Sequence, residues 1–488
     1  MNNISKVLSL VLLHFSVQCF GQSVKPHPVS EEFTSVDYTV TVNGQPVQVF
    51  HAGLNVHFAS FDFDGHVEVK VATIMESVKN DIEKKYVGQV YHKYIPRDSG
   101  SFWNGQAIVR PLSKNVNVVT NEKEARFMIQ VPGQYSVERP GTSNYLDRVL
   151  FLFANKPEDT AKPKEGDNGV VYLKPGIHQQ NIDLSSGQTL YLAPGAVLFG
   201  SVNVWDAKDV KIKGRGIILH YGAQSEDKDN GYMVRKNWHP LTTSNVDGLT
   251  VEGVTFIGRS RTWSIQLNST YNSSFDNIKV LSVNPQNVNG DGFDWYGGGN
   301  AKITNCLVRS SDDCFAFFVP EGLNKASETK SDSATIKNIQ IENCVLWSTI
   351  ANVYRIGFGG QKLHTENIQM RNCDVVHIGR GEWKAPWSIV HTMTTNIHGK
   401  AVHSNYLFEN VHFEEATAFI GVQNEEAIFR DIVFRNIKMT GDPVPSYIRS
   451  NMEGVIFDNV VVNGKKVMSN EDIPIRENSK EIKGLVFK

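Results

Sequence analysis

Three aspartates in two short segments have the residue type and the spacing for joint acid–base chemistry. Asn-Gly-Asp-Gly-Phe-Asp occupies positions 289–294, and Ser-Asp-Asp-Cys at 311–314 starts 22 residues later (311 − 289). That interval is about one turn of a parallel β-helix, in which residues one coil apart stack roughly 4.8 Å from each other. Asp291, Asp312 and Asp313 are therefore predicted to converge on one patch of surface.

Clustered carboxylates repel one another unless a task requires them, and the commonest such task is cleavage of a glycosidic bond. One protonated carboxyl donates to the leaving oxygen, and a carboxylate roughly 6.5–9.5 Å away activates water when the enzyme is inverting. The alternative is that these acids cap solenoid turns or bind a structural cation, as an isolated Asp-Asp pair would in most proteins. The third acid, one coil earlier on a glycine-marked turn, favours catalysis.

Five further residues are candidates for contact with a substrate. Asp294 is placed to support the acids, and Trp295 and Tyr296 follow it directly. Exposed aromatic rings near such carboxylates commonly stack on sugar faces, but strand alternation lets only one of this pair point outward. Trp238, in a polar loop, is a candidate groove wall. Arg355 contacts either the substrate or an aspartate. This mechanism requires neither a metal ion nor a cofactor, so none is expected.

From about Gly169 to the end, β-rich segments recur with Asn or Gly at a fixed phase. The repeated asparagines are Asn277, Asn305, Asn343, Asn372, Asn410, Asn436 and Asn459. Their smallest separation is 23 residues (459 − 436), which indicates a coil of constant size with loop insertions on one side. Asn and Gly also tolerate a left-handed backbone at a bend. The predicted fold is all-β, a right-handed parallel β-helix.

The chain before this repeat predicts a separate domain. Residues 22–155 contain alternating strands with Asn-Gly and Pro-Gly turn signals, as a small N-terminal β-sandwich would. Residues 156–169 are polar and rich in Pro and Gly, which is typical of a linker. Residues 170–488 would then form the β-helix catalytic domain.

The first 21 residues predict a secretory signal peptide. A short positive start precedes an apolar run, and small residues flank a cleavage point near Gly21-Gln22. The mature protein is therefore expected to be secreted or periplasmic. Lipid attachment at Cys19 is the alternative, although the preceding Gln18 does not suit it.

The composition of the chain limits the kinds of molecule that the protein is expected to bind. The chain has 488 residues with 49 basic and 51 acidic side chains, and this balance gives no sign of nucleic-acid binding. After the start, no apolar run reaches the length of about 18 residues that would suggest a membrane span. A polysaccharide is the expected partner, and the protein is expected to be a monomer.

The four remaining cysteines do not have the tight spacing of a zinc site. Cys306, Cys344 and Cys373 each follow an asparagine at the same phase, which predicts a buried ladder of thiols. The alternative for an exported protein is a disulfide framework, but a chain of this size can fold without one.

The acidic segments resemble a clan of inverting β-helix hydrolases. This clan comprises the polygalacturonases (glycoside hydrolase family 28) and the dextranases and isopullulanases (family 49). The shared signature is D-G-x-[DE] followed about one coil later by D-D, here Asp291-Gly-Phe-Asp294 and Asp312-Asp313. The resemblance implies that Asp312 is the general acid and that Asp291 and Asp313 position and deprotonate water.

Other segments depart from the polygalacturonases. Ala351-Asn-Val-Tyr stands where their Gly-His-Gly is expected, and their later Arg-Ile-Lys has no clear match. The order of sandwich, linker and helix is similar to the dextranase family, which implies a secreted endo-hydrolase of an α-glucan such as dextran. Hydrolysis of galacturonan or another anionic glycan is the first alternative. A polysaccharide lyase on the same fold and a non-catalytic glycan-binding β-helix are the others.

Overall fold

The computed structural model of the chain describes fourteen segments. They are residues 23–53, 56–74, 105–121, 123–142, 148–158, 161–220, 235–259, 263–283, 289–318, 334–357, 363–379, 388–392, 401–423 and 425–488. The predicted signal peptide and Cys19 lie outside these residues.

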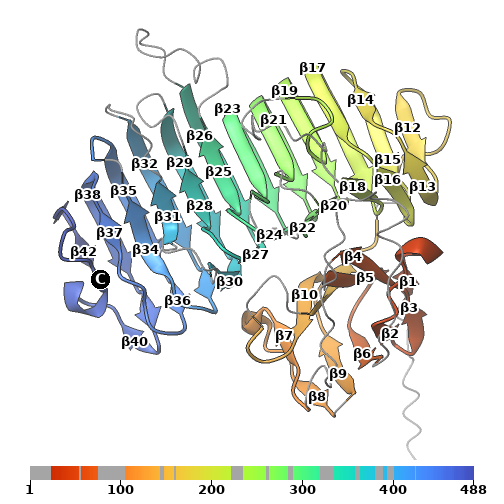
Figure 1. Cartoon of the computed structure of the whole chain (residues 1–488), viewed down its shortest axis with the longest axis horizontal. Helices are drawn as coiled ribbons and strands as arrows, with labels where there is room; N and C mark the ends of the chain where they lie inside the picture. The colour runs from red at the N-terminus through yellow and green to blue at the C-terminus, as the bar shows by residue number, and fades with distance from the viewer. Residues whose placement is uncertain are drawn as a thin grey trace, which may run out of the picture.

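The first eleven strands form two sheets that face each other (Figure 1). One sheet has the order β1-β5-β11-β10-β7 with β4 beside β5, and the other has the order β3-β2-β6-β9-β8. The strands are β1 (Val24–Pro26), β2 (Tyr38–Val42), β3 (Gln45–Val47), β4 (Val49–Gly53), β5 (Val56–Phe63), β6 (Val67–Thr73), β7 (Ile108–Arg110), β8 (Val118–Thr120), β9 (Glu124–Ile129), β10 (Gly133–Glu138) and β11 (Val149–Asn155). Alternate side chains such as Val69, Phe127 and Leu152 fill the space between the sheets.

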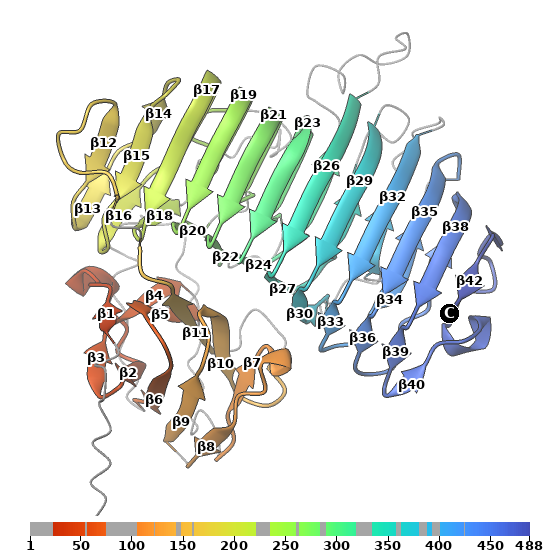
Figure 2. The same ribbon diagram turned by 180° about the vertical axis from the view of Figure 1, so that it is seen from behind.

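Two long sheets of parallel strands follow (Figure 2). The larger contains β12 (Val170–Leu173), β14 (Ile182–Leu184), β15 (Thr189–Leu192), β17 (Val202–Gly214), β19 (Leu241–Glu252), β21 (Ile265–Asp276), β23 (Phe293–Thr304), β25 (Phe315–Phe318), β26 (Ala334–Glu342), β28 (Tyr354–Ile356), β29 (Leu363–Arg371), β31 (Ser388–Thr392), β32 (Val402–Glu409), β34 (Ala418–Val422), β35 (Ile428–Arg435), β37 (Tyr447–Ile448), β38 (Asn451–Asp458), β41 (Ile482–Lys483) and β42 (Val486–Phe487).

The smaller sheet contains β13 (Gly176–Gln179), β16 (Ala196–Phe199), β18 (Ile217–His220), β20 (Thr255–Gly258), β22 (Lys279–Ser282), β24 (Leu307–Ser310), β27 (Val345–Ser348), β30 (Asp374–Ile378), β33 (His412–Phe413), β36 (Lys438–Met439), β39 (Val461–Val462) and β40 (Lys465–Lys466). Short 3-10 helices cover Glu31–Phe33, Leu112–Lys114 and Asn470–Asp472. The chain alternates between the two sheets and stacks each coil on the one before, so the predicted parallel β-helix is confirmed.

Asparagines mark the bends between strands. All seven repeated asparagines have a positive φ, between 51° and 57°. Their side chains also bond from coil to coil, for example from Asn436 Nδ2 to Asn410 Oδ1 at 2.9 Å and from Asn459 Nδ2 to Asn436 Oδ1 at 2.9 Å. A second ladder, which the repeat did not reveal, joins Asn272, Asn300, Asn338 and Asn367 within the long strands. Asparagines of these ladders thus supply both the left-handed bend and a bond to the next coil.

The cysteines belong to the interior of the helix. Cys306, Cys314, Cys344 and Cys373 are free thiols and buried. Cys306, Cys344 and Cys373 stack in successive coils, where the backbone N–H of Cys344 donates to Cys373 Sγ at 3.4 Å. The predicted thiol ladder is confirmed.

The sandwich packs against the smaller sheet of the helix (Figure 1). Phe58 and Phe151 lie on the outer face of the sandwich and share one apolar cluster with Leu281 and Trp347 of the helix. The rings of Phe151 and Trp347 meet edge to face at 5.8 Å. The acidic segments lie at turns that lead from the smaller sheet into the larger one, with Asp291 between β22 and β23 and Asp312 and Asp313 between β24 and β25.

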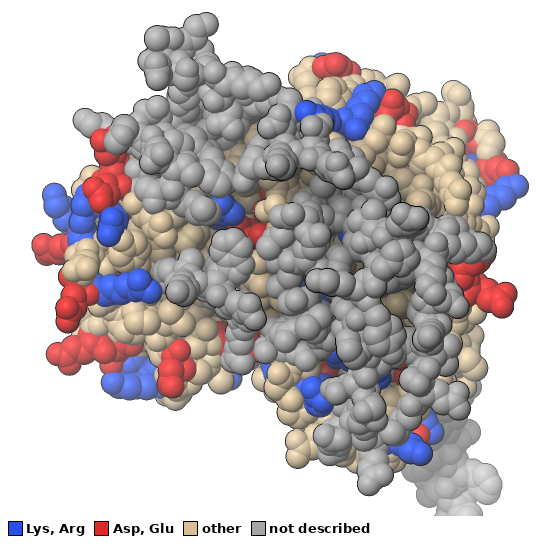
Figure 3. All heavy atoms as spheres, viewed as in Figure 1, with Lys and Arg blue, Asp and Glu red and all other residues tan. Residues whose placement is uncertain are grey.

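The described surface shows no dominant charge on the face drawn in Figure 3, where Lys and Arg side chains alternate with Asp and Glu around the margin. Within the described residues, no helix has the length and apolar character needed to cross a membrane.

Candidate active site

Strand register brings the acidic segments together. Phe293, Phe315 and Tyr354 are aligned on successive coils, and their side chains point into the core. The next residue on each strand therefore points outward, which forms the row Asp294, Ala316, Arg355. The residues two positions before the aligned aromatics are Asp291, Asp313 and Asn352, which make a second row beside the first.

Glycines let the coils stack closely at this point. A Cβ atom on Gly290 would lie 2.0 Å from Ser311 Oγ, and a Cβ atom on Gly292 would lie 2.4 Å from Val308 Cγ1. A side chain at either position would therefore force the coils apart. The Gly-Asp-Gly sequence thus holds Asp291 tightly against the coil that carries Asp312 and Asp313.

Asp313 is fully buried and held by three donors. Its Oδ1 accepts from the backbone N–H of Asn352 at 3.0 Å and from Asn352 Nδ2 at 2.8 Å. Its Oδ2 accepts from Arg355 Nη1 at 3.1 Å. Because a carboxylate has about four acceptor sites, one site on Oδ2 stays open for a further donor such as water.

Asp291 and Asp294 form a buried carboxyl pair. Burial, and then the like charges of the other aspartates, raises the pKa of Asp291 well above its usual range and does the same to Asp294. Both shifts favour the protonated form, because two charged carboxylates buried this close together repel each other. No amide, hydroxyl or cation donates to either oxygen of Asp294.

Asp312 is partly exposed at the edge of this group. Burial of its carboxyl and the charge of Asp313 raise the pKa of Asp312 to about 6. The backbone N–H of Asn289 donates to its Oδ2 at 3.0 Å, which opposes part of the rise and fixes the carboxyl in place. We refer to Asp291, Asp294, Asp312 and Asp313 together as the acid cluster.

Arg355 is the cation that contacts the acid cluster. Burial alone would lower its pKa, but Asp313, Asp312 and Asp291 together raise it, so the guanidinium stays charged. His391 follows Arg355 in the same outward row, and burial lowers the pKa of His391 to about 4. The neighbouring imidazole is therefore neutral at ordinary pH.

The structure brings together all four predicted acids and Arg355, but the aromatic predictions need correction. Trp295 is fully buried in the helix core, with its ring 5.5 Å from that of Phe317, so its prediction as a substrate contact is wrong. The reason is alternation, because Asp294 points outward and Trp295 must then point inward. Tyr296 does point outward, yet its ring is enclosed against Phe318 at 5.0 Å and packs beside the cluster.

Trp238 lies further toward the N-terminus. It is half-buried, and the Arg235 guanidinium lies 5.3 Å from its ring centroid. Its neighbour His239 is two positions before Leu241, which pairs with Ile265 in the next coil, and Ile265 pairs with Phe293. Trp238 is therefore about two coils away from Asp291.

Sequence reasoning missed three residues of this site. Asn352 anchors Asp313 and also accepts from the backbone N–H of Ser388 at 3.0 Å. His391 and Gln266 lie in the outward row on either side of the acids. Side chains alternate in direction along each strand and the residues beside it, so all three can be identified as outward. This identification requires the register between coils to be known.

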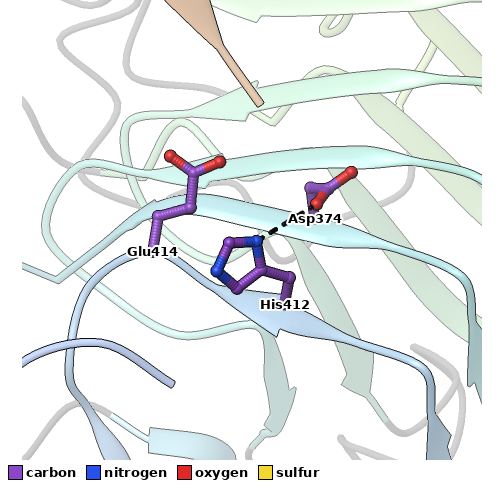
Figure 4. Close-up of side chains that lie close together, drawn as sticks. All are labelled: Asp374, His412 and Glu414. Carbon is purple, nitrogen blue, oxygen red and sulfur yellow. Dashed lines mark ion pairs between the residues drawn. The ribbon is translucent and has the colours of Figure 1, made fainter. Parts of the chain in front are cut away.

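One further group of described residues could hold a metal ion, namely Asp374, His412 and Glu414 (Figure 4). It lies on the smaller sheet, where His412 Nδ1 is 3.7 Å from Asp374 Oδ1. Both oxygens of Glu414 are already engaged, one by the Arg110 guanidinium and the other by the backbone N–H of Leu112. A guanidinium at this position opposes a second cation, so we assign no metal ion to this group.

Comparison with known proteins supports the fold. Dex49A from Penicillium minioluteum superposes with a TM-score of 0.62 and 14% identity, covering 94% of this chain and 95% of that chain. A hyperthermoactive exopolygalacturonase from Thermotoga maritima gives a TM-score of 0.42 and 14% identity, covering 61% of this chain and 84% of that chain.

In sequence, 122 residues are 31% identical to a probable exopolygalacturonase B from Aspergillus terreus. This match covers 23% of the present chain and spans 28% of that relative's length. No protein-family model matches the sequence. The resemblance to the β-helix hydrolases is thus confirmed in the fold, which extends over nearly the whole chain in the case of Dex49A.

Proposed function

We propose that this protein is an inverting glycoside hydrolase that cleaves a polysaccharide at the acid cluster. The observation that carries the proposal is the convergence of four carboxyls from two adjacent coils around one guanidinium. Such a concentration of like charge destabilises a fold and is typical of sites that need one protonated and one ionised carboxyl. The sequence signature shared with the β-helix hydrolases points to the same chemistry.

Asp312 is the general acid of this proposal. Asp312 lies at the partly exposed edge of the cluster, and its pKa of about 6 keeps a proton available for the leaving oxygen in mildly acidic conditions. Asp313 is the stronger candidate for the base, because Arg355 and Asn352 hold its carboxylate and leave an acceptor site for water. Asp291 completes the water site from the preceding coil, where burial raises its pKa.

A neutral α-glucan such as dextran is the substrate we favour. Arg355 is committed to Asp313, and the histidine beside it is neutral, so this part of the row offers little attraction to a uronate carboxylate. The order of sandwich, linker and helix agrees with the dextranase-type resemblance. An anionic galacturonan is the second candidate, because the sequence match is to a probable exopolygalacturonase. We further propose that the enzyme is exported and acts as a monomer.

Release of reducing ends from dextran, pullulan and polygalacturonate tests the proposal, with wild type and Asp312→Asn measured side by side. Activity on dextran or pullulan that is absent in the variant is expected, and the anomer of the first product, followed by NMR, should be inverted. Activity confined to polygalacturonate would overturn the substrate. Absence of activity on all three, together with unchanged glycan binding in the variant, would favour a non-catalytic glycan-binding protein.

A further inference from the structure

Polar side chains continue the outward row beyond the acids toward the N-terminus. Thr242 pairs with Gln266, and Gln266 pairs with Asp294, so the three occupy successive coils at a spacing of about 4.8 Å. Thr242 and Gln266 are completely buried. Nevertheless, neither Thr242 Oγ1 nor either polar atom of the Gln266 amide has a hydrogen-bond partner among the described residues.

His239 adds a fourth polar group from the neighbouring row. Its Nδ1 lies 2.9 Å from the carbonyl oxygen of Trp263, which can only accept, so Nδ1 carries the hydrogen and Nε2 is a bare acceptor. Nε2 is buried and has no hydrogen-bond partner within the part of the chain that the structure describes. The imidazole ring is fixed by stacking on Trp263 at 5.6 Å with an interplanar angle of 7°.

These groups are difficult to explain as packing. A buried amide or hydroxyl without a partner costs about 1–3 kcal/mol, and native proteins keep such groups where a ligand or ordered water completes them. Along this row, the polar atoms of Thr242 and Gln266 lack a partner among the described residues, and the row continues into Asp294 of the acid cluster. The orphaned atoms therefore form one continuous strip rather than scattered defects.

We propose that Thr242, Gln266 and His239 form a sugar-binding subsite on the N-terminal side of the acid cluster, which takes a neutral pyranose unit of the glycan. This inference rests on the proposed hydrolase function. The amide of Gln266 can donate to one hydroxyl and accept from its neighbour, while His239 Nε2 accepts a third. A uronate at this position would meet Asp294 and three uncharged side chains, so the subsite selects against anionic units.

The Trp263 indole is the wall of this subsite and not its stacking platform. One of its faces packs on His239, and the Phe318 ring stacks on it at 5.3 Å. Because both rings lie nearly parallel to the indole and Trp263 is only 4% exposed, the indole offers little surface on which a sugar ring could stack. Recognition therefore depends on the hydrogen-bonding groups, which can discriminate strongly when a partner is missing.

The decisive experiment measures equilibrium binding of isomaltohexaose by calorimetry in an Asp312→Asn background, where no turnover interferes. Gln266→Leu should weaken binding about tenfold or more, since it removes both amide contacts. His239→Asn, whose amide can still donate to the Trp263 carbonyl, should weaken binding several-fold. Gln340→Leu is the matched control, because Gln340 is an exposed glutamine on β26 and should leave binding unchanged.

The outcomes separate the subsite from the proposed function. If Asp312→Asn binds no isomaltohexaose, both the α-glucan substrate and the subsite fail. If it binds and Gln266→Leu binds equally well, the subsite alone fails, and ordered water completes these groups. Thermal unfolding distinguishes misfolding from lost contacts, because Gln266→Leu removes an unpartnered buried amide and should leave the melting temperature unchanged or higher.

Discussion

Glu138, at the contact between sandwich and helix, lies between two cations, whereas Asp291 in the acid cluster faces other carboxyls. His377 Nε2 is 2.8 Å and Arg110 Nε is 3.3 Å from Glu138 Oε2, and His377 Nδ1 is 2.9 Å from Glu415 Oε1. We call Arg110, Glu138, His377, Glu414 and Glu415 the interface network. Both regions bury several carboxylates next to the same β-helix.

The pKa values of Glu138 and Asp291 are shifted in opposite directions. Burial alone would raise the pKa of Glu138, but His377 and Arg110 outweigh it and lower the pKa. In the acid cluster, burial and neighbouring charges act together and raise the pKa of Asp291 and Asp312. Carboxylates paired with cations therefore lie at the contact between sandwich and helix. Carboxyls grouped with other carboxyls lie in the acid cluster, where we propose that protons are exchanged. Substitutions in each region test this difference.

The largest effect is expected from Asp312→Asn. Loss of the general acid should lower kcat by about 10³-fold or more, because an amide cannot protonate the leaving oxygen. Stability should change in the opposite direction. The pKa of Asp312 is about 6 in the folded protein and about 3.9 in the unfolded chain. Ionisation of Asp312 therefore destabilises the fold increasingly as the pH rises from about 4 to about 6 and above. At pH 7.5 the variant should be more stable by up to about 2 kcal/mol, with no gain at pH 3.5.

Asp374→Asn is the control for this prediction. Burial also raises the pKa of Asp374, but the residue lies on the smaller sheet and not in the acid cluster. Its kcat should equal that of wild type. An equal loss of activity in both variants would mean that any buried aspartate is needed for a stable fold and that the acid cluster has no special role.

The next largest effect is expected from Glu138→Gln in the interface network. Removing this charge leaves His377 and Arg110 without their shared partner, which should destabilise the protein by about 3–5 kcal/mol in urea unfolding. The kcat measured well below the melting temperature should change little, since Glu138 is on the sandwich. A large loss of kcat with unchanged stability would contradict the division between the two regions.

Arg355→Gln tests the acid cluster by removing a positive charge from beside it. Arg355 holds down the pKa of Asp291 and Asp312, so its removal should let both rise further. The alkaline limb of the pH profile of kcat/KM, which reports the general acid Asp312, should move to higher pH by about one unit. Arg355→Lys keeps the charge and should move this limb less. An unshifted alkaline limb in Arg355→Gln would show that the guanidinium does not influence the general acid.

The sequence was sufficient to predict the β-helix and the meeting of the acids, because both depend on short-range regularities. The asparagine phase repeats with each coil, and Asp291 lies only one coil from Asp312 and Asp313. By contrast, Gln266 and His391 were missed because loop insertions of unequal length separate the coils, and register cannot be counted through them. The direction of Trp295 could have been predicted from Asp294, since neighbouring strand residues point to opposite faces.

The interface network could not be predicted at all from the sequence. Glu138 and His377 are 239 residues apart, and only docking of the sandwich on the smaller sheet brings them together. The same holds for Arg110 and Glu414, which belong to different domains. Neither local pattern nor repeat spacing carries such information, because these contacts depend on the surfaces of two already folded units.

A further expected effect is the pH dependence of stability that His377 contributes. Burial alone would lower the pKa of His377, but Glu138 and Glu415 raise it to about 9. A raised histidine pKa stabilises fully below the unfolded value of about 6.5, and the contribution disappears as pH rises through about 9. The difference in unfolding free energy between wild type and His377→Gln should therefore shrink by up to about 3 kcal/mol between pH 6 and pH 9.5. A difference that stays constant over this range would mean that His377 is neutral, and the contrast with the acid cluster would then rest on Arg110 alone.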